Sequence, residues 1–383
     1  MKKALQLASV ASMIDQFNME NIELMQSLGL SVDVVADFTN PGTITRERAD
    51  KLKSRLERNG IRVFDVAIPR SLNPVRIASA YRRIKRLIKR EDYSLIHCHS
   101  PIGGAICRLA ASGYRRRGLK VVYTAHGFHF YTGAPLKNWL IFYPIEKALS
   151  RVTDVLITIN NEDYDRAKKK FKAKNTIYVP GVGIDTNNFA HNDKDEVLCK
   201  EFGLSPDDTV ALSVGELNSN KNHEMVIRAL SIMKQNGSLP DRFFYFIIGK
   251  GEKEKELNIL VRERGVSDIV RIVGFRSDVK DFYAAADFFI FPSYREGLSV
   301  ALMEAMASGL PVACSRIRGN TDLVDKEGGV FFDPADVDSI VDGISAILAM
   351  DRSRAGEHNL LKIKEFDTSI VRSRIKEVYS SLI

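Results

Sequence analysis

Cysteine, tryptophan and long apolar runs are all scarce in this 383-residue sequence, which has four cysteines and one tryptophan. No two cysteines have the close spacing of a zinc ribbon or of a redox Cys-x-x-Cys pair. No window approaches the roughly 18 apolar residues that a membrane-spanning helix requires. The N-terminal apolar stretch is broken by Gln6 and Asp15, so we interpret it as a first strand rather than a signal peptide. These absences argue against a disulfide scaffold and a membrane-spanning protein, and they fit a reduced cytoplasmic compartment.

The charge is uneven along the chain. Residues 1–180 carry 31 Lys and Arg against 16 Asp and Glu, a balance of +15, whereas residues 181–383 carry 25 against 32, a balance of −7. This asymmetry suggests that the two halves meet different partners. The length and the 45% hydrophobic content are sufficient for the cores of two domains.

Both halves alternate short apolar runs with longer helical patterns, which is typical of β-α-β units with parallel sheets. The predicted fold is therefore α/β, with two Rossmann-like, doubly wound domains. We predict strands within residues 31–38, 61–68, 93–100, 120–127 and 154–160 of the first half, and within residues 209–217, 243–251, 269–275, 287–293 and 310–315 of the second.

Pro180, Gly181 and Gly183 interrupt this rhythm just before a polar stretch at residues 191–196. We place the domain boundary there. Residues 1–182 would form an N-terminal domain, residues 183–365 a C-terminal domain, and residues 366–383 a helix that returns to pack on the N-terminal domain. Such sheets bind ligands beyond the carboxyl ends of their strands, so we expect the site in an interdomain cleft.

A helix with clear start and stop signals follows the predicted strand at residues 287–293. Ser299 suits the N-cap, Gly309 the C′ position, and Pro311 blocks continuation. The backbone amides of residues 297–300 would point out of the helix start, where the macrodipole favours an anion such as a phosphate.

Two glutamates bracket this helix start. Glu296 would face a part of the ligand other than the phosphate, and Glu304, about two turns into the helix, could accept hydrogen bonds from a vicinal diol such as a ribose. Alternatively, Glu296 only complements the helix dipole and Glu304 lies on a solvated face. The spacing alone supports both interpretations equally.

Lys221 lies near the start of another predicted helix, where a cation opposes the dipole and is better explained by an anionic ligand than by stability. The alternative is an exposed loop lysine. Gly249 and Gly251 form a strand-to-helix turn, but the turn has neither the Lys-Ser/Thr of a phosphate-binding loop nor the full Gly-x-Gly-x-x-Gly pattern.

The stretch from Ile272 to Ser315 closely resembles the C-terminal signature of retaining glycosyltransferases of family 4, which have the two-domain GT-B fold. Its Glu-x7-Glu pair stands between Phe-Pro-Ser and Ala-x-Gly-x-Pro-Val. The resemblance extends to YTAHGFHFY and to VLITINNEDYDRAKKKF through PGVGID in the first half. The most similar branch builds capsular or exopolysaccharide repeat units and lipid-linked oligosaccharides.

The resemblance implies an acceptor-binding N-terminal domain and a C-terminal domain that binds a UDP-sugar donor. Glu296 would approach the donor sugar, Glu304 would hold the ribose hydroxyls, and Lys221 would bind the diphosphate. The base would pack near a Gly-Phe-Arg turn. The remaining donor contacts would come from Gly215, Asn220, Phe275, Arg276, Gly297, Leu298, Ser299 and Val300.

Two positions depart from the family pattern. Many members have an arginine after the glycine of the first C-domain strand, whereas Glu216 follows Gly215 here; we expect Lys221 to suffice, with Arg295 as the alternative second cation. Many members also have a glycine-rich loop after the first strand of the N-terminal domain, whereas this chain has none. The acceptor contacts there are therefore only candidates, namely Ser9, Ser12 and Met13.

His126 precedes Gly127, whose missing side chain leaves room for a ligand. In the family this histidine faces the donor sugar from the N-terminal domain, and we expect the same here; the alternative is a buried histidine with satisfied hydrogen bonds. His97 and His99 alternate along a strand but have no carboxylate or further ligand nearby, so we expect structural roles for them rather than a metal.

A retaining transfer must stabilise an oxocarbenium-like centre and the departing diphosphate. The helix amides and Lys221 can stabilise the diphosphate without a metal. We recognise no Asp-x-Asp triplet that could chelate Mg²⁺, so we expect no metal and no cofactor besides the donor. Attack from the leaving-group face and a covalent intermediate on Glu296 are both compatible with the sequence.

The N-terminal positive charge is concentrated in YRRIKRLIKR, residues 81–90, where basic and apolar residues alternate at helical spacing. Such a helix can lie on an anionic membrane surface. Together with the aromatic residues of PLKNWLIFYPIEK, it would suit a lipid-linked acceptor and peripheral attachment to the inner face of a bacterial cell membrane. The alternative is a solvated helix whose apolar stripe faces the core. The candidate contacts are Arg82, Arg83, Arg86 and Trp139.

The sequence thus predicts a metal-independent retaining hexosyltransferase that moves a hexose or N-acetylhexosamine from a UDP-sugar to an undecaprenyl-diphosphate-linked sugar in the assembly of bacterial surface polysaccharide. One alternative is a UDP-sugar 2-epimerase of the same architecture. Another is a non-catalytic basic protein that binds nucleic acid, but no recognised nucleic-acid motif accompanies the charge. We therefore expect no nucleic-acid partner.

Overall fold

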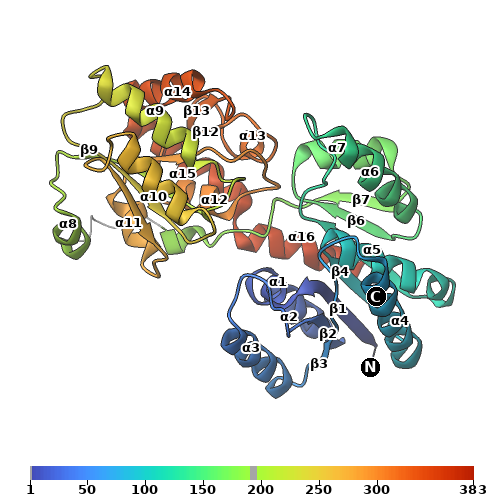
Figure 1. Cartoon of the computed structure of the whole chain (residues 1–383). Helices are drawn as coiled ribbons and strands as arrows, with labels where there is room; N and C mark the ends of the chain where they lie inside the picture. The colour runs from blue at the N-terminus through green and yellow to red at the C-terminus, as the bar shows by residue number, and fades with distance from the viewer. Residues whose placement is uncertain (1, 190–195) are drawn as a thin grey trace. The chain divides into compact units, whose positions relative to one another are not determined.

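The computed structural model describes residues 2–189 and 196–383, so residues 191–195 of the predicted polar stretch lie outside the described residues. The chain divides into two compact units. Unit 1 comprises Met1–Val182 and Ser369–Ile383, and unit 2 comprises Gly183–Thr368 (Figure 1). Each is an α/β unit on a parallel sheet, which confirms the predicted fold class.

Unit 1 contains seven strands in the order β3-β2-β1-β4-β5-β6-β7, all parallel to their neighbours. The central strands are almost wholly buried, as expected when helices cover both faces of a parallel sheet. The strands are β1 (Lys3–Val10), β2 (Ser31–Asp37), β3 (Arg62–Asp65), β4 (Leu95–His99), β5 (Lys120–Ala125), β6 (Val155–Thr158) and β7 (Asn175–Tyr178).

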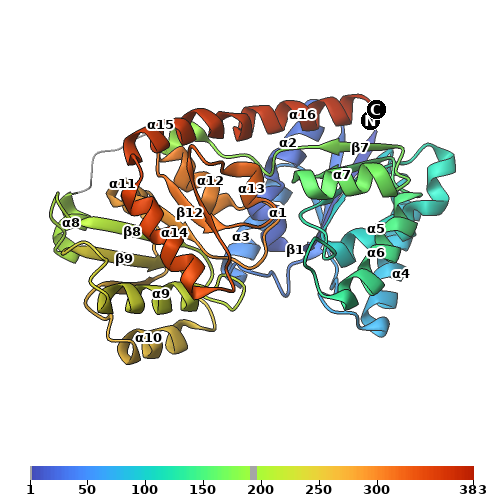
Figure 2. The same ribbon diagram turned by 90° about the horizontal axis from the view of Figure 1, so that it is seen from above.

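Two apolar clusters cover the faces of this sheet. The first is formed with α1 (Ala11–Phe17), α2 (Met19–Ser27), α3 (Arg46–Arg58) and α16 (Thr368–Ser380). Figure 2 shows α16 beside α2, where Arg372 and Glu23 approach to 3.9 Å. The second cluster is formed with α4 (Pro74–Glu91), α5 (Pro101–Ala111), α6 (Leu136–Ser150) and α7 (Asn161–Lys170). A 3₁₀ turn, η1 (Ser112–Arg117), follows α5.

Unit 2 repeats the design with six parallel strands in the order β10-β9-β8-β11-β12-β13. Phenylalanine and β-branched residues dominate its central strands, whose side chains are buried. The strands are β8 (Thr209–Val214), β9 (Phe243–Ile248), β10 (Val270–Gly274), β11 (Phe288–Phe291), β12 (Val312–Ser315) and β13 (Gly329–Phe332).

On one face of this sheet, α9 (His223–Gln235), α10 (Glu254–Glu263) and α14 (Val337–Ala349) share an apolar cluster (Figure 2). The other described helices of unit 2 are α8 (Glu196–Phe202), α11 (Val279–Ala285), α12 (Val300–Ala307), α13 (Asn320–Leu323) and α15 (Arg352–Lys362), with the 3₁₀ turns η2 (Thr186–Phe189) and η3 (Ile363–Phe366).

The sequence prediction missed two short strands, β7 and β13. Both are edge strands of four residues with partly exposed side chains. β7 lies directly before Pro180 and Gly181, the residues on which the predicted domain boundary was based, so its short pattern was not recognised as a strand. An edge strand needs only one partner, so it shows a weaker buried pattern than a central strand.

Candidate active site

Each sheet has one place where the strand order reverses direction: between β1 and β4 in unit 1, and between β8 and β11 in unit 2. Ligands of doubly wound sheets bind beyond the carboxyl ends of the strands at such a switch point. In unit 2 the segments that follow β8 and β11 contain Lys221 and Glu296. In unit 1 the corresponding positions lie near His99, at the end of β4.

The switch point of unit 2 brings Lys221 and Glu296 together. The Lys221 Nζ atom lies 2.7 Å from Glu296 Oε1 and 4.7 Å from the centroid of the Phe291 ring. The side chains of Lys221 and Glu296 are only 17% and 14% exposed. Two residues 75 positions apart therefore form a largely shielded ion pair at the expected ligand position.

The loops that carry this pair are joined by hydrogen bonds. The amide of Tyr294 donates to the Asn220 carbonyl (2.8 Å), and Asn220 Nδ2 donates to the Arg295 carbonyl (3.0 Å). Asn222, which has a left-handed backbone (φ 56°), donates from Nδ2 to the carbonyl of Pro292 (3.1 Å). Asn220 therefore positions the loop through its side chain and backbone, whereas the exposed side chain of Arg295 shows no such role.

Two residues that were not predicted from the sequence, Arg318 and Gly319, support Glu296. Arg318 is buried, and its Nε donates to the Glu296 carbonyl (3.1 Å). Gly319 has a positive φ of 80°, and an added Cβ would lie 2.3 Å from the Gly297 carbonyl oxygen. The segment after β12 thus packs against the Glu296 loop and holds its backbone in place. An Arg-Gly pair just beyond a predicted strand was the available signal.

Helix α12 confirms the predicted start and stop. The Ser299 side chain accepts a hydrogen bond from the Leu302 amide (3.4 Å), and Gly309 beyond the helix end has φ 72°. The predicted depth of Glu304 was wrong, because the helix begins only at Val300, so Glu304 lies little more than one turn into it. The residues from Glu296 to Ser299 precede the helix because the capping residue is extended.

Glu304 does not lie on a solvated helix face. Burial raises the pKa of its carboxyl group, an effect that the Tyr283 hydroxyl and Lys280 partly offset. The Tyr283 hydroxyl lies 3.0 Å from Glu304 Oε2 and 3.1 Å from the Ala301 carbonyl oxygen, so it can donate to either. One carboxylate oxygen is thus left to accept other hydrogen bonds.

Gly249 and Gly251 are explained by backbone packing. An added Cβ would lie 1.8 Å from the carbonyl oxygen of Gly215 and 2.3 Å from that of Leu217, respectively. The turn after β9 therefore lies directly against the loop after β8. The two glycines are therefore needed for close backbone packing, which explains why they are present without the rest of a phosphate-binding loop motif.

The two residues predicted to contact the base, Phe275 and Arg276, differ in how accessible their side chains are, and their contact with a base stays a prediction. Phe275 is 71% exposed, and Lys250 Nζ lies 5.3 Å from its ring centroid. The guanidinium of Arg276 is instead held by Asp278 and Glu201, at 2.6 and 2.9 Å. Phe275 thus has an exposed ring, whereas the guanidinium of Arg276 is already paired with two carboxylates.

In unit 1 the three histidines near the switch point form a connected group. His126 Nε2 lies 3.0 Å from His99 Nδ1, and His99 Nε2 lies 2.8 Å from Gln6 Nε2. His97 contacts the hydroxyls of Tyr379 (2.6 Å) and Thr124 (2.8 Å). These protein partners account for His97 and His99 without a metal.

Burial keeps these rings neutral near pH 7. It lowers the pKa of His126 to about 4 and that of His97 to about 3, and it holds the pKa of His99 well below its usual value. Part of the surface of His126 is exposed to solvent. Its neutral ring is therefore accessible to a ligand.

The acceptor candidates Ser12 and Met13 lie in a helix, whereas the family pattern has a loop after the first strand. β1 ends at Val10 and α1 begins at Ala11, without a connecting loop. Ser12 is buried, with its hydroxyl against Gly42. Met13 is partly buried against the first apolar cluster of unit 1. Their contacts with an acceptor stay a prediction.

The membrane interpretation of α4 was wrong in its apolar part. Ile84, Leu87 and Ile88 are buried in the second cluster of unit 1, because the stripe faces the sheet. Trp139 is also partly buried and lies 5.7 Å from the ring of Phe130. The predicted basic residues Arg82, Arg83 and Arg86 are exposed.

Asp-x-Asp triplets do occur in the sequence, at residues 163–165, 193–195 and 336–338, so the expectation that the enzyme needs no metal cannot rest on their absence. The second lies outside the described residues. In the other two, Asp163 accepts from the Phe128 amide (2.8 Å), and Asp336 caps α14. No group of three or more His, Cys, Asp or Glu among the described residues is arranged to hold a metal. Metal independence stays a prediction.

Comparisons with known proteins identify the family. Residues 18–188 match the family model described as Glycosyltransferase Family 4, and residues 195–359 match the model described as Glycosyl transferases group 1. A Bacillus subtilis protein named "Putative glycosyltransferase EpsD" is 39% identical over 270 residues, which cover 70% of each chain. The chain belongs to glycosyltransferase family 4. The resemblance seen in the sequence is thereby confirmed.

Further relatives agree with this family. The Escherichia coli UDP-Gal:alpha-D-GlcNAc-diphosphoundecaprenol alpha-1,3-galactosyltransferase is 28% identical over 345 residues, which cover 88% of this glycosyltransferase and 85% of that protein. The crystal structure of Anabaena HepE in complex with UDP-glucose matches with a TM-score of 0.76 at 19% identity, with full coverage of both chains. The glycosyltransferase therefore has the GT-B fold.

Proposed function

We propose that this family 4 enzyme transfers a hexose or N-acetylhexosamine from a UDP-sugar, with retention and without a metal, to a sugar on undecaprenyl diphosphate. The Lys221–Glu296 ion pair carries the proposal. It lies at the switch point of unit 2, with Glu304 little more than one turn into α12. The named Escherichia coli relative, whose substrates are a UDP-sugar and a diphosphoundecaprenol-linked sugar, supports the choice of substrates.

The donor site would work by an exchange of partners at Lys221. The ammonium group holds the Glu296 carboxylate at 2.7 Å. An incoming diphosphate, which carries more negative charge, would compete for the same ammonium group. Lys221 would then stabilise the leaving diphosphate, while Glu296 would be free to meet the donor sugar.

The nucleoside end would be bound farther along α12. Glu304 would accept hydrogen bonds from the ribose hydroxyls through the oxygen that Tyr283 does not engage. The exposed ring of Phe275 would contact uracil. On the side of unit 1, we propose that His126 contacts the donor sugar in the complete enzyme, as the family resemblance implies.

We also propose that unit 1 binds the cytoplasmic surface of the bacterial membrane through α6 rather than through the apolar residues of α4. Helix α6 differs from an ordinary surface helix, which buries its apolar residues. Among its fifteen residues only Glu146 and Ser150 are buried. Leu136 and Leu140 are 73% and 68% exposed, and Ile141 and Ile145 are each 41% exposed. A surface stripe of this kind marks an interaction site.

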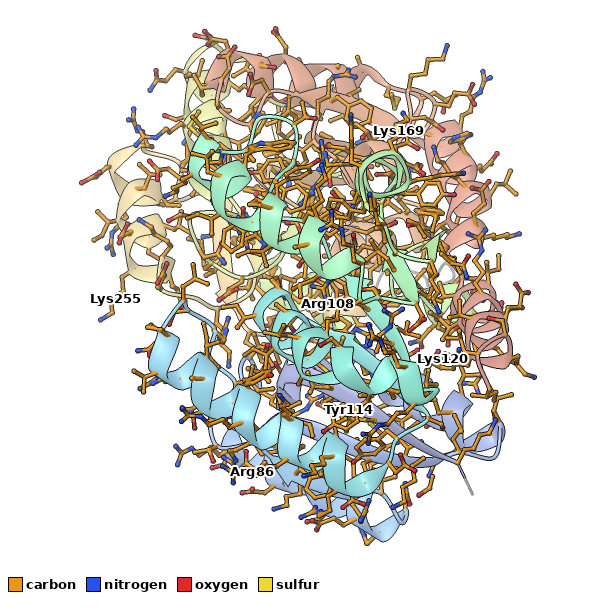
Figure 3. The ribbon with its side chains drawn as sticks, turned by 90° about the vertical axis from the view of Figure 1, so that its right-hand side faces the viewer. Arg86, Arg108, Tyr114, Lys120, Lys169 and Lys255 are labelled. Carbon is orange, nitrogen blue, oxygen red and sulfur yellow. The ribbon has the colours of Figure 1, made fainter. Side chains whose placement is uncertain are left out.

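A buried ion pair holds α6 in this orientation. Arg108 Nη2 of α5 donates to Glu146 Oε2 (2.8 Å), and the Tyr123 hydroxyl of β5 donates to Glu146 Oε1 (3.2 Å). Figure 3 shows α4, α5 and α6 side by side, with Arg108 between the helices and Arg86 on α4. Unit 1 therefore carries exposed basic residues on α4 and η1, which both contact α5, and exposed apolar residues on α6, which contacts α5 as well. Basic and apolar residues together form the pattern of an anionic lipid-binding surface.

Transfer is tested with a panel of radiolabelled UDP-sugars and a membrane lipid extract. Transfer predicts that label from one donor moves into the lipid fraction, with the same yield in EDTA and with the donor's anomeric configuration in the product. Label that stays on nucleotide with a changed sugar would instead establish the epimerase. A product that forms only with added divalent metal would overturn metal independence alone.

Membrane binding is tested by flotation with vesicles of phosphatidylglycerol and phosphatidylcholine. The double variant Leu140→Ser/Ile141→Ser should lose binding, and Arg82→Gln/Arg83→Gln/Arg86→Gln should weaken it most at low salt, at about 1 kcal/mol per basic residue. Ile259→Ser, at a residue of unit 2 that is 47% exposed, is the matched control. Unchanged flotation of the α6 variant, or dimerisation through this stripe, would exclude the proposed surface.

A further inference from the structure

A chain of hydrogen bonds runs from the backbone of α1 to His126. Asn18 Nδ2 donates to the Met13 carbonyl (2.7 Å). Gln6 Nε2 lies 2.8 Å from Asn18 Oδ1 and 2.8 Å from His99 Nε2. His99 Nδ1 in turn lies 3.0 Å from His126 Nε2. Apart from the reachable His126, the side chains that form this chain are buried.

Asn18 fixes the direction of these hydrogen bonds. Its NH₂ group is committed to the Met13 carbonyl, and its Oδ1 also accepts from Asn21 Nδ2 (3.0 Å). The oxygen must therefore face donors, so Gln6 turns its NH₂ group towards it. The second proton of that NH₂ group points at His99 Nε2, which has to accept.

The protonation of both rings follows from this direction. A neutral imidazole carries one proton, and the hydrogen bond of one nitrogen decides which nitrogen carries it. Because His99 Nε2 accepts, His99 Nδ1 carries the proton and donates to His126 Nε2. His126 Nε2 therefore accepts, and the proton of the neutral His126 ring lies on Nδ1.

This arrangement leaves one polar atom of the Gln6 amide without a hydrogen bond. Gln6 Oε1 is buried without a hydrogen-bond partner. Turning the amide over would pair this oxygen with a proton on His99, but it would set the oxygen against Asn18 Oδ1. Only the observed orientation satisfies Asn18, Asn21 and His99 together, and a buried unsatisfied oxygen is otherwise selected against.

We propose that Asn18, Gln6 and His99 are positioning residues that hold His126 as a hydrogen-bond donor through Nδ1–H and prevent it from acting as a base. The proposal deepens the proposed contact of His126 with the donor sugar and rests on it. Burial supports it by keeping His126 neutral, with a pKa of about 4. The Nδ1–H group can donate to a sugar hydroxyl oxygen, but neither ring nitrogen retains a free lone pair for a proton from the acceptor.

The protonation is measured directly, without substrate, on the full-length protein with ¹⁵N-labelled histidine. Long-range proton–nitrogen correlation spectra distinguish Nδ1–H from Nε2–H rings, and a His126→Gln variant assigns the His126 signals. The wild type should show His126 protonated on Nδ1. Gln6→Glu places an acceptor opposite His99 Nε2 and should move the His126 proton to Nε2.

Two further variants keep the test decisive. Gln6→Leu removes the donor without adding a charge, and it should give a mixture of both protonated forms of His126 if Gln6→Glu does not fold. Gln16→Glu makes the same chemical change on the exposed side of α1 and should leave the spectrum and the transfer rate unchanged. With the Gln6 variants, kcat should fall, by up to about 100-fold if the hydrogen bond of His126 is misplaced, while the affinity for UDP stays at the wild-type value.

The two proposals fail in different ways. A wild-type His126 protonated on Nε2, or a His126 proton that does not move in the Gln6 variants, overturns the positioning role whatever the activity. A proton that moves while kcat stays at the wild-type value confirms the positioning chain and removes His126 from the proposed sugar contact.

Discussion

The two units share one strand order around their switch points, but the side chains placed there differ in charge. Unit 2 presents a cation and an anion as a shielded ion pair, Lys221 with Glu296. Unit 1 presents neutral imidazoles that are joined by hydrogen bonds to Gln6 and Asn18. The sheet provides the position, and the residue types decide whether that position suits a charged or a neutral part of a ligand.

This difference matches the two ends of the proposed donor. A diphosphate needs a cation, and its release must be stabilised as charge develops. A sugar hydroxyl is neutral and is better matched by a donor that carries no charge. If the charged and neutral positions have these separate tasks, substitutions in the two units should affect diphosphate binding and sugar transfer differently.

The largest effect is expected at the ion pair of unit 2. Lys221→Ala should lower kcat/KM at least about 100-fold and also weaken UDP binding, because a donor to the leaving group is lost. Glu296→Gln should lower turnover to a similar extent but leave UDP affinity nearly intact, because Glu296 would meet the sugar. Label transfer and UDP calorimetry measure the two effects, with Lys255→Ala as the control. Near-normal turnover in either site variant would refute the role assigned to that residue.

Unit 1 also contains a buried ion pair, between Arg108 of α5 and Glu146 of α6, which lies between these two helices. Glu146→Ala should lower the free energy of unfolding of unit 1 by about 3–5 kcal/mol, because Arg108 is left buried and unpaired. Glu201→Ala removes an exposed partner of Arg276 in unit 2 and should cost less than about 1 kcal/mol. Urea unfolding monitored by hydrogen exchange gives the free energy of unfolding of each unit separately. Equal losses for Glu146→Ala and Glu201→Ala would contradict the expected difference between a buried and an exposed ion pair.

Acid should open unit 1 before unit 2. The folded pKa values of His97 and His126, about 3 and 4, lie below the ordinary value of 6.5. Below pH 6.5 the unfolded chain therefore binds more protons, and stability falls as the pH drops towards the folded values. Each such group contributes up to about 1.4 kcal/mol per pH unit.

In unit 2 only His223 is comparable among the described residues, with a pKa lowered to about 3 by burial. After division by the intrinsic exchange rate at each pH, the amide protection factors between pH 7 and pH 5 should therefore fall first in the sheet of unit 1. The His97→Gln variant should show a shallower pH dependence. Earlier opening of unit 2 would show that other groups control the acid response.

The smallest effect is expected at the ribose end. Glu304→Gln should weaken UDP binding about tenfold, which corresponds to a lost charge-assisted hydrogen bond. The affinity of 2′-deoxy-UDP should change less than that of UDP, because one of the two hydroxyls is absent. Glu252→Gln, an exposed change in the same unit, is the control. Equal losses for both nucleotides would place Glu304 away from the ribose.

The sequence predicted the class of fold and the start of α12, because both depend on local patterns. Ser299, Gly309 and Pro311 act within a few residues of each other, so their roles can be inferred without tertiary contacts. The ion pair between Lys221 and Glu296 was not predicted as a contact, although both residues were singled out. Only the parallel strand order brings residues that far apart in sequence to one edge.

Other features were beyond the reach of local pattern. The apolar residues of α4 alternate with basic ones in a way that fits a membrane surface and a protein core equally, and the sheet decided for the core. Helix α6 appeared as an aromatic stretch, but its exposed side is aliphatic because Arg108 draws Glu146 inward. The support of the Glu296 loop by Arg318 depends on the chain path after β12, just beyond the recognised stretch, and on a contact between residues 22 positions apart.

The contact of Tyr379 with His97 has a consequence for the order of synthesis. Residues of the first seven strands leave the ribosome early, but α16, which completes one face of their sheet, is made only after unit 2. At about 5–20 residues per second, the intervening 190 or so residues take roughly 10–40 s to translate. Unit 2 is therefore made while unit 1 still lacks α16, so the sheet of unit 1 can be fully covered only after α16 has been made.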